Sequence, residues 1–148
     1  MTYNETIILK PEDQPAPMEV IGTHITVLAA NTKTGGYEIT LQEGGEGMGP
    51  PPHKHDWDES FYILRGKVLF TCKGESVLCS TGTLVHIPAN TVHSFQYGAG
   101  GASMLEMTSA GGRATQMFES LSREIPPGPP DVEKVVSVLA DNGVSVVL

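Results

Sequence analysis

Short runs in which apolar and polar residues alternate fill most of the first 111 residues. Alternation with a period of two is typical of strands with one buried and one exposed face. Glycine and proline separate these runs, as they do in sheets built from tight turns. The pattern predicts strands at Thr6–Leu9, Thr23–Ala30, Tyr37–Glu43, Glu59–Leu64, Lys67–Cys72, Ser76–Cys79, Thr83–Ile87, His93–Tyr97 and Ala102–Thr108. Many short strands indicate an all-β sandwich or barrel.

Apolar residues recur at helical spacing after residue 111. They form two sets, which are Ala114, Met117, Phe118 and Leu121, and Val132, Val135, Val136 and Leu139. A proline-rich segment, 126–130, separates the two predicted helices, and Asp131 is a suitable N-cap for the second. We expect these helices to pack outside the barrel or against a second subunit. A role for Met117 and Phe118 in a lid stays open.

The length of 148 residues fits one domain. We expect a β-barrel over residues 1–111 and a helical extension of the same domain over residues 112–148. The net charge of −8 argues against nucleic acid and against an anionic membrane surface as partners. No apolar run approaches the ~20 residues of a membrane span, and residues 1–5 do not resemble a signal peptide. The default expectation is a cytoplasmic protein.

Two cysteines, Cys72 and Cys79, flank a predicted hairpin turn at residues 73–75. In a cytoplasmic chain of this size we expect two reduced, partly buried thiols. Neither cysteine lies within the segments that carry the histidines, so we leave both out of the site.

The strongest signal for chemistry lies between Gly47 and Gly66. His53 and His55 are two positions apart, so on a strand their side chains point to the same face. Glu59 has the same parity and joins them if the turn after His55 brings the chain back in register. Two imidazoles and a carboxylate on one face are ligands that suit a borderline divalent metal.

A second segment supplies a further ligand from a distant strand. Gly82 and Pro88 bound a short strand, and His93 opens the next one. His93 is therefore the fourth residue of a predicted metal site, together with His53, His55 and Glu59.

These two segments resemble the motifs of the cupin superfamily. The first cupin motif, G-x5-H-x-H-x3-E-x6-G, fits every fixed position from Gly47 to Gly66. The second, G-x5-P-x-G-x2-H-x3-N, fits at Gly82, Pro88 and His93. It departs at Asn90, where glycine is usual, and at Tyr97, where asparagine is usual. Asparagine also tolerates positive φ, so the first departure is mild. The resemblance implies a double-stranded β-helix, or jelly-roll, barrel.

Three neutral imidazoles and one carboxylate leave one or two positions open on a five- or six-coordinate metal. We expect one divalent transition metal ion per chain, and these ligand types suit Fe, Ni, Mn, Co, Cu or Zn. Phe61 and Ile63 share the parity of Glu59, and Phe95 and Tyr97 share that of His93. These four residues are the predicted apolar walls of a substrate pocket, which suits a flat, aromatic or enolic small molecule.

Within the cupins, this chain resembles the quercetin 2,3-dioxygenase-like group in three features. These are the proline-rich segment before His53, the run from Glu59 to Gly66 and the C-terminal helices. This resemblance implies an oxidoreductase that binds a flavonol through its 3-hydroxyl, after which dioxygen adds and the heterocycle opens. It also implies that Glu59 is both ligand and general base. The three motif histidines are then ligands only.

Two other functions stay open: a metal-dependent isomerase or lyase of a small sugar or acid, and a non-catalytic small-ligand-binding module. Cupins commonly form dimers, so a homodimer is expected by resemblance. His24 and His86 alternate with core positions and are expected to face outward. Trp57, in the loop before Glu59, is either a structural clamp or dimer contact, or a substrate contact.

Overall fold

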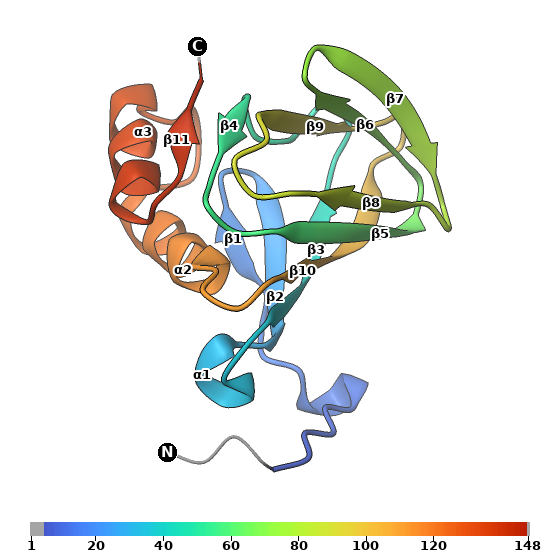
Figure 1. Cartoon of the computed structure of the whole chain (residues 1–148), viewed down its shortest axis with the longest axis vertical. Coiled ribbons are helices and arrows are strands. Elements are labelled where there is room, and N and C mark those ends of the chain that lie inside the picture. The colour runs from blue at the N-terminus through green and yellow to red at the C-terminus, as the bar shows by residue number, and fades with distance from the viewer. Residues whose placement is uncertain (1–4, 148) are drawn as a thin grey trace.

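Two antiparallel sheets face each other across a barrel-like core in the computed structural model, which describes residues 5–147 (Figure 1). The six-stranded sheet has the spatial order β1 (Met18–Val20), β2 (Thr23–Ala29), β3 (Glu38–Gly44), β10 (Ala102–Thr108), β5 (Glu59–Arg65) and β8 (Leu84–Ile87). The five-stranded sheet has the order β11 (Ser145–Val146), β4 (His53–Lys54), β9 (His93–Tyr97), β6 (Lys67–Cys72) and β7 (Glu75–Ser80). The predicted all-β jelly-roll class is confirmed.

Most predicted strands are present, with bounds that shift by at most one residue. The strand predicted at Thr6–Leu9 is wrong, because residues 5–10 have no strand assignment. Alternating apolar residues form a strand only where another strand supplies hydrogen-bond partners, and Ile7 and Ile8 stay exposed instead. The sequence pattern also missed β1, β4 and β11, which are too short to show a period.

Four short helical segments complete the fold: the 3₁₀ turn Pro11–Asp13, α1 (Asn31–Thr34), α2 (Ala114–Glu124) and α3 (Val132–Asp141). The predicted N-cap of α3 is confirmed, since Asp131 Oδ1 accepts a hydrogen bond from the Lys134 backbone N–H at 3.2 Å. The α2 helix packs on β1, and α3 packs on α2 and β11. Both helices lie outside the sheets, at the left in Figure 1. They cover the open end of the barrel there.

Glu38, at the start of β3, fixes where α2 begins. Its side chain is only 1% exposed. The carboxylate accepts hydrogen bonds from the backbone N–H groups of Ala114 at 3.2 Å and Thr115 at 2.8 Å, and from the Thr108 hydroxyl at 3.2 Å. Free N–H groups at a helix N-terminus attract a negative charge. A strand of the six-stranded sheet thus anchors the helix that covers the barrel.

The buried apolar residues form two clusters. One lies between the sheets and contains Phe61, Ile63, Val68, Phe70, Cys79, Ile87, Phe95, Tyr97, Ala102 and Met104. The other joins the helices to β1 and β2 and contains Val20, Ile25, Trp57, Ala114, Phe118, Leu121, Ile125, Val138, Leu139 and Val144. The functional cavity described below is lined by members of both clusters.

Both cysteines are free thiols, as predicted. Cys79 lies opposite Val68, and Cys72 lies opposite Glu75, so the two cysteines do not face each other across the β6–β7 hairpin. Burial raises the pKa of each thiol, which keeps both protonated at neutral pH.

Candidate metal centre

The four residues of the predicted metal site lie together where the two sheets meet. His53 on β4 is directly opposite His93 on β9, and Glu59 begins β5 in the other sheet. Donor atoms of these three residues and His55 all lie within 4.8 Å of one another. Ligands bound about 2.1 Å from one ion lie up to about 4.2 Å apart when they are opposite. The cluster is therefore close to the size that a single metal ion requires.

Backbone hydrogen bonds hold the turn between His55 and Glu59 against the second motif. The Asn90 N–H donates to the His55 carbonyl at 2.7 Å, and the Ala89 N–H donates to Asp58 Oδ1 at 2.8 Å. Asn90 has a φ of 65°, so asparagine adopts the left-handed conformation in place of the usual glycine. The two motifs, distant in sequence, form one rigid corner.

In all three histidines the same ring nitrogen, Nδ1, is hydrogen-bonded to a backbone carbonyl. The Nδ1 atom lies 2.8 Å from the Pro51 carbonyl in His53, 3.0 Å from the Trp57 carbonyl in His55 and 2.8 Å from the Thr91 carbonyl in His93. A carbonyl oxygen only accepts, so each Nδ1 carries the hydrogen. Each neutral ring then presents an unprotonated Nε2, which is the form that binds a metal.

The spacing between these nitrogens and Glu59 fits a cation. Glu59 Oε1 lies 3.1 Å from His55 Nε2 and 2.6 Å from His93 Nε2. His93 Nε2 is buried and has no well-aligned hydrogen-bond partner. An unprotonated nitrogen and a carboxylate oxygen repel at such a distance unless a proton or a metal ion lies near both. The four donor residues and the unpartnered His93 Nε2 together fit a metal ion.

Burial and mutual contact set the charges in this cluster. Burial and the neighbouring His93 lower the pKa of His53 to about 4. Burial would raise the pKa of Glu59, but the close contacts with His55 and His93 outweigh it and hold the pKa at about 2. Burial would lower the pKa of His93, but the contact with Glu59 raises it above its ordinary value. At neutral pH the carboxylate is charged and His53 is neutral, as metal binding requires.

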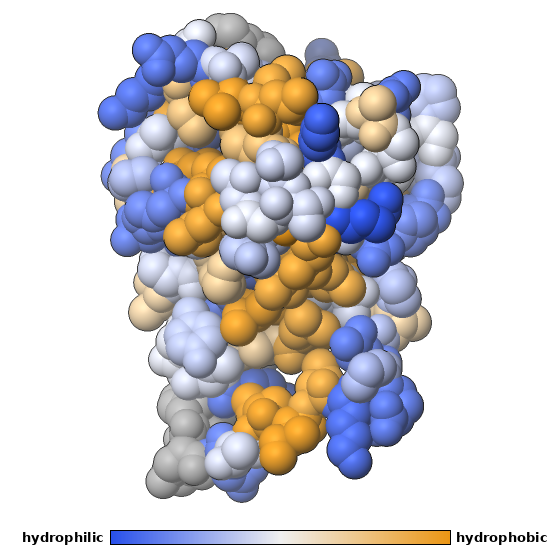
Figure 2. Space-filling view, turned by 90° about the vertical axis from the view of Figure 1, so that its right-hand side faces the viewer, coloured by the Kyte–Doolittle hydropathy of each residue, from blue (hydrophilic) through white to orange (hydrophobic). Residues whose placement is uncertain are grey.

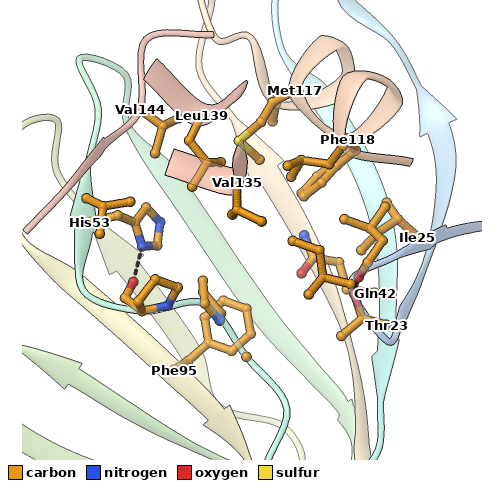
Figure 3. Close-up of a pocket in the computed structure, with 18 of the residues that line it drawn as sticks. Thr23, Ile25, Gln42, His53, Phe95, Met117, Phe118, Val135, Leu139 and Val144 are labelled. Atoms are coloured by element: carbon orange, nitrogen blue, oxygen red, sulfur yellow. Dashed lines mark hydrogen bonds between the residues drawn. The ribbon is translucent and has the colours of Figure 1, made fainter. Parts of the chain in front are cut away.

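A cavity of about 400 Å³ is lined by His53, His55 and Glu59 of this cluster. Figure 3 shows His53 and Phe95 on one side of it, Ile25 and Gln42 on the other, and Met117 and Phe118 above. Helices α2 and α3 supply most of the apolar cover, through Met117, Phe118, Leu121, Val135, Val136 and Leu139. A metal held by the cluster would face a largely apolar cavity, as small-ligand sites do.

A family model described as "Cupin domain" matches residues 37–108. The solved structure of KdgF from Halomonas sp. superposes with a TM-score of 0.65 over 72% of this chain and 94% of that chain. The sequence identity between the two is 17%, so this likeness concerns the fold alone. The chain belongs to the cupin superfamily.

Two curated cupin relatives carry dioxygenase names. Over 80 residues, 52% of this chain, the cupin is 36% identical to quercetin 2,3-dioxygenase of Bacillus subtilis (strain 168). Over 50 residues, 31% of this chain, it is 44% identical to acireductone dioxygenase of Alcanivorax borkumensis. The matches cover 24% and 28% of those proteins, so the chain spans about a quarter of the length of the relatives it matches. Among residues 5–147 of this cupin, no helix has the length and apolar character of a membrane span.

Three of the four predicted wall residues line the cavity: Phe61, Phe95 and Tyr97. Ile63 does not reach it and lies fully buried between the sheets. It is four residues from Glu59 on the same face of β5, which places it deeper in the barrel. Tyr97 stands where the cupin motif usually has asparagine. Its ring fits because residue 44 is a glycine, since a Cβ at Gly44 would lie 2.2 Å from the ring.

Trp57 lies against the metal cluster inside the chain. Its ring stacks on His55 with centroids 4.2 Å apart, and it is only 3% exposed. Trp57 therefore packs on His55 and is too buried for a subunit contact. It also lines the cavity, where a substrate contact stays a prediction. His24 and His86 are exposed, as expected, and His86 Nδ1 hydrogen-bonds with the Ser60 hydroxyl at 2.9 Å.

Sequence reasoning missed two polar residues of the cavity, Gln42 and Glu106. It also missed that α3 lines the cavity. Burial and the charge of Glu59 raise the pKa of Glu106 well above its ordinary value. The signal for both residues was parity: with Glu59 facing inward, its partner Thr108 and then Glu106 must also face inward.

Proposed function

We propose that this cupin is a metal-dependent dioxygenase of the quercetinase type, which acts on a flavonol-like or other enolic or aromatic small molecule. One observation carries the proposal: His53, His55 and Glu59 of the four-residue cluster line a largely apolar cavity with aromatic walls. The identity to the Bacillus subtilis quercetin 2,3-dioxygenase supports the reaction class. Dioxygen is the proposed second substrate.

His53, His55, Glu59 and His93 would hold one divalent metal ion, either Fe, Ni, Mn, Co, Cu or Zn. When bound, the metal supplies a Lewis acid that makes a nearby hydroxyl more acidic and can hold two reactants side by side. The backbone carbonyls of Pro51, Trp57 and Thr91 keep the three imidazole rings oriented for this role.

Glu59 is the proposed catalytic residue. It lines the cavity, is deprotonated at neutral pH and accepts the proton from the enolic hydroxyl of the substrate. Phe61 and Phe95 offer flat apolar surfaces on which an aromatic substrate can lie. Met117, Phe118, Val135 and Leu139 exclude water from the space above it.

Oxygen uptake tests this proposal. Protein loaded separately with each metal should consume oxygen with a flavonol or an enolic diketone, and Glu59→Gln should abolish the uptake. Glu43→Gln, an exposed position on β3, is the matched control and should keep it. No uptake with any metal and substrate, together with equal ligand binding by Glu59→Gln, would contradict the proposal. Turnover without oxygen would support an isomerase or lyase, and tight binding without turnover would support a binding module.

A homodimer is proposed for the face that carries β7 and β8. Exposed apolar side chains occur on these edge strands and on β5, namely Leu64, Val77, Leu78 and Leu84. Figure 2 shows hydrophobic side chains gathered in a band down this face. Light scattering should give twice the chain mass for the wild type and a lower mass for Leu84→Glu. A monomeric wild type at high protein concentration would contradict the dimer.

A further inference from the structure

The inner wall of the six-stranded sheet carries polar residues that the metal site does not use. Gln42 on β3 and Glu106 on β10 are 3% and 5% exposed, and both line the cavity. Thr40 lies between them in register, since it is opposite Glu106 and two residues from Gln42. These buried polar groups face a space that is otherwise mostly apolar.

Their partners within the protein are weak. The Thr40 hydroxyl donates to Glu106 Oε1 at 3.5 Å, and Gln42 Nε2 donates to Thr40 Oγ1 at 3.5 Å. Both distances are at the outer limit for a hydrogen bond. Glu38, on the same wall, has three shorter bonds to Thr108 and the start of α2. Glu106 and Gln42 also contact each other, and both line the cavity, so they can offer further hydrogen bonds to a ligand there.

The strand register places the pair on a line that leads away from the metal cluster. Glu59 is opposite Thr108, Glu106 is two residues before Thr108, and Gln42 is two residues after Thr40. Glu59, Glu106 and Gln42 are therefore successive diagonal neighbours on three adjacent strands, at about 7 Å for each step. Figure 3 shows Gln42 across the open space from His53. The cavity has a polar end at the metal cluster and another at Gln42.

We propose that Gln42, with Glu106 beside it, is a specificity-determining site that hydrogen-bonds an oxygen function of the ligand remote from the metal. The ligand class is a flat molecule of about two fused or linked rings that carries a hydroxyl or carbonyl group at each end. The Gln42 amide both donates and accepts, so it binds either group. This inference rests on the proposed function for the enolic end of the ligand only.

Two probes that differ only in remote hydroxyl groups test the proposal. Quercetin carries hydroxyls on its outer rings, and 3-hydroxyflavone lacks them but keeps the enolic end. Zinc-loaded protein under anaerobic conditions allows binding to be measured without oxidation. Trp57 is the only tryptophan of the chain and lies at the cavity, so its fluorescence reports occupancy. The wild type should bind quercetin about tenfold more tightly than 3-hydroxyflavone.

Gln42→Met keeps the length of the side chain and removes the amide. It should bring the ratio of the two dissociation constants to within about twofold of one, with little change for 3-hydroxyflavone. Glu43→Met is the matched control, because Glu43 is the next residue on β3, is exposed and does not line the cavity. It should keep the wild-type ratio. If Gln42→Met does not fold, Gln42→Asn serves in its place, since the shorter amide should also lower the ratio.

Equal affinity of the wild type for the two probes would overturn the proposal, and so would an equal loss of the ratio in Glu43→Met and the Gln42 variant. The expected ratio without oxygen uptake in air would contradict the dioxygenase function and support this inference. Oxygen uptake together with equal affinities for the two probes would support the dioxygenase function and contradict this inference. Binding of neither probe would contradict both.

Discussion

The two inner walls of the barrel share one apolar cluster but differ in the polar residues that they bury. The five-stranded sheet contributes Val68 and three aromatic residues, Phe70, Phe95 and Tyr97; the ring centroid of Phe95 lies 5.4 Å from that of Phe70 and 5.6 Å from that of Tyr97. The six-stranded sheet adds Phe61, Ile63, Ile87 and Met104 to this cluster, and it also buries Glu38, Thr40, Gln42, Glu59, Glu106 and Thr108. We call the first four residues the apolar wall and the last six the polar wall; burial stabilises the apolar wall directly, whereas the polar wall needs partners.

The partners of the polar-wall residues indicate where the functional sites of this fold lie. A buried polar group lowers the free energy of unfolding unless it finds a partner. Glu38 finds the N-terminus of α2, and Glu59 finds the histidines. Gln42 and Glu106 have long hydrogen bonds through Thr40 and line the cavity, which is why we propose that they bind a ligand. The apolar wall supports the fold, and the polar wall anchors α2 through Glu38 and contributes Glu59 to the metal cluster.

Truncation of the apolar wall should have the largest effect on stability. Phe70→Ala removes a buried ring that packs on Phe61 and Phe95, and it should lower the free energy of unfolding by about 4 kcal/mol. Denaturant unfolding followed by circular dichroism measures the loss. Leu78→Ala, on the exposed side of β7, should change stability by less than about 0.5 kcal/mol. Equal effects of the two substitutions would show that the apolar wall does not support the fold.

Removal of the buried carboxylate that anchors α2 should have the next largest effect. Glu38→Ala leaves three donors without their acceptor and should cost about 3 kcal/mol in unfolding free energy. Amide hydrogen exchange should speed up first in α2, because its N-terminus is released. Glu43→Ala, exposed on the same strand, is the control and should leave exchange unchanged. Normal protection of α2 in Glu38→Ala would contradict the anchoring role.

Acid should weaken metal binding by a smaller, graded amount. Contact with Glu59 raises the pKa of His93 above its ordinary 6.5, and a proton on this ring must leave before a metal binds. Affinity is therefore highest above that raised pKa and should fall about tenfold for each pH unit below it. His53, with a pKa of about 4, does not compete until the pH approaches that value. Zinc titrations from pH 5 to 8 measure the slope, and a flat profile would contradict this account.

The sequence predicted the barrel and its four clustered side chains because both depend on local spacing. Alternation revealed the strands, and two motifs with fixed spacing marked His53, His55, Glu59 and His93. Glycine positions at tight turns marked the motif ends. These signals act over a few residues, so one sequence is enough to read them.

The remainder depends on contacts between distant segments. The inward face of β3 carries Glu38, Thr40 and Gln42, while Ile39 and Leu41 are only half-buried on the other face. A prediction from hydrophobicity alone would bury Ile39 and Leu41 and expose Glu38, Thr40 and Gln42, which is the opposite of the structure. Likewise, the periodicity of α2 and α3 predicts one apolar face on each helix but not what it covers. The hydrogen bonds of Glu38 fix where α2 begins, and one of them joins residues 77 positions apart.

Metal stoichiometry tests the central claim most directly. Wild-type protein saturated with a divalent transition metal and freed of excess ion should contain one ion per chain by elemental analysis. His86→Ala, which removes an exposed histidine, should retain that ion, and His93→Ala should bind it at least about 100-fold more weakly. Equal metal content in the wild type and His93→Ala would contradict a metal centre built from His53, His55, Glu59 and His93.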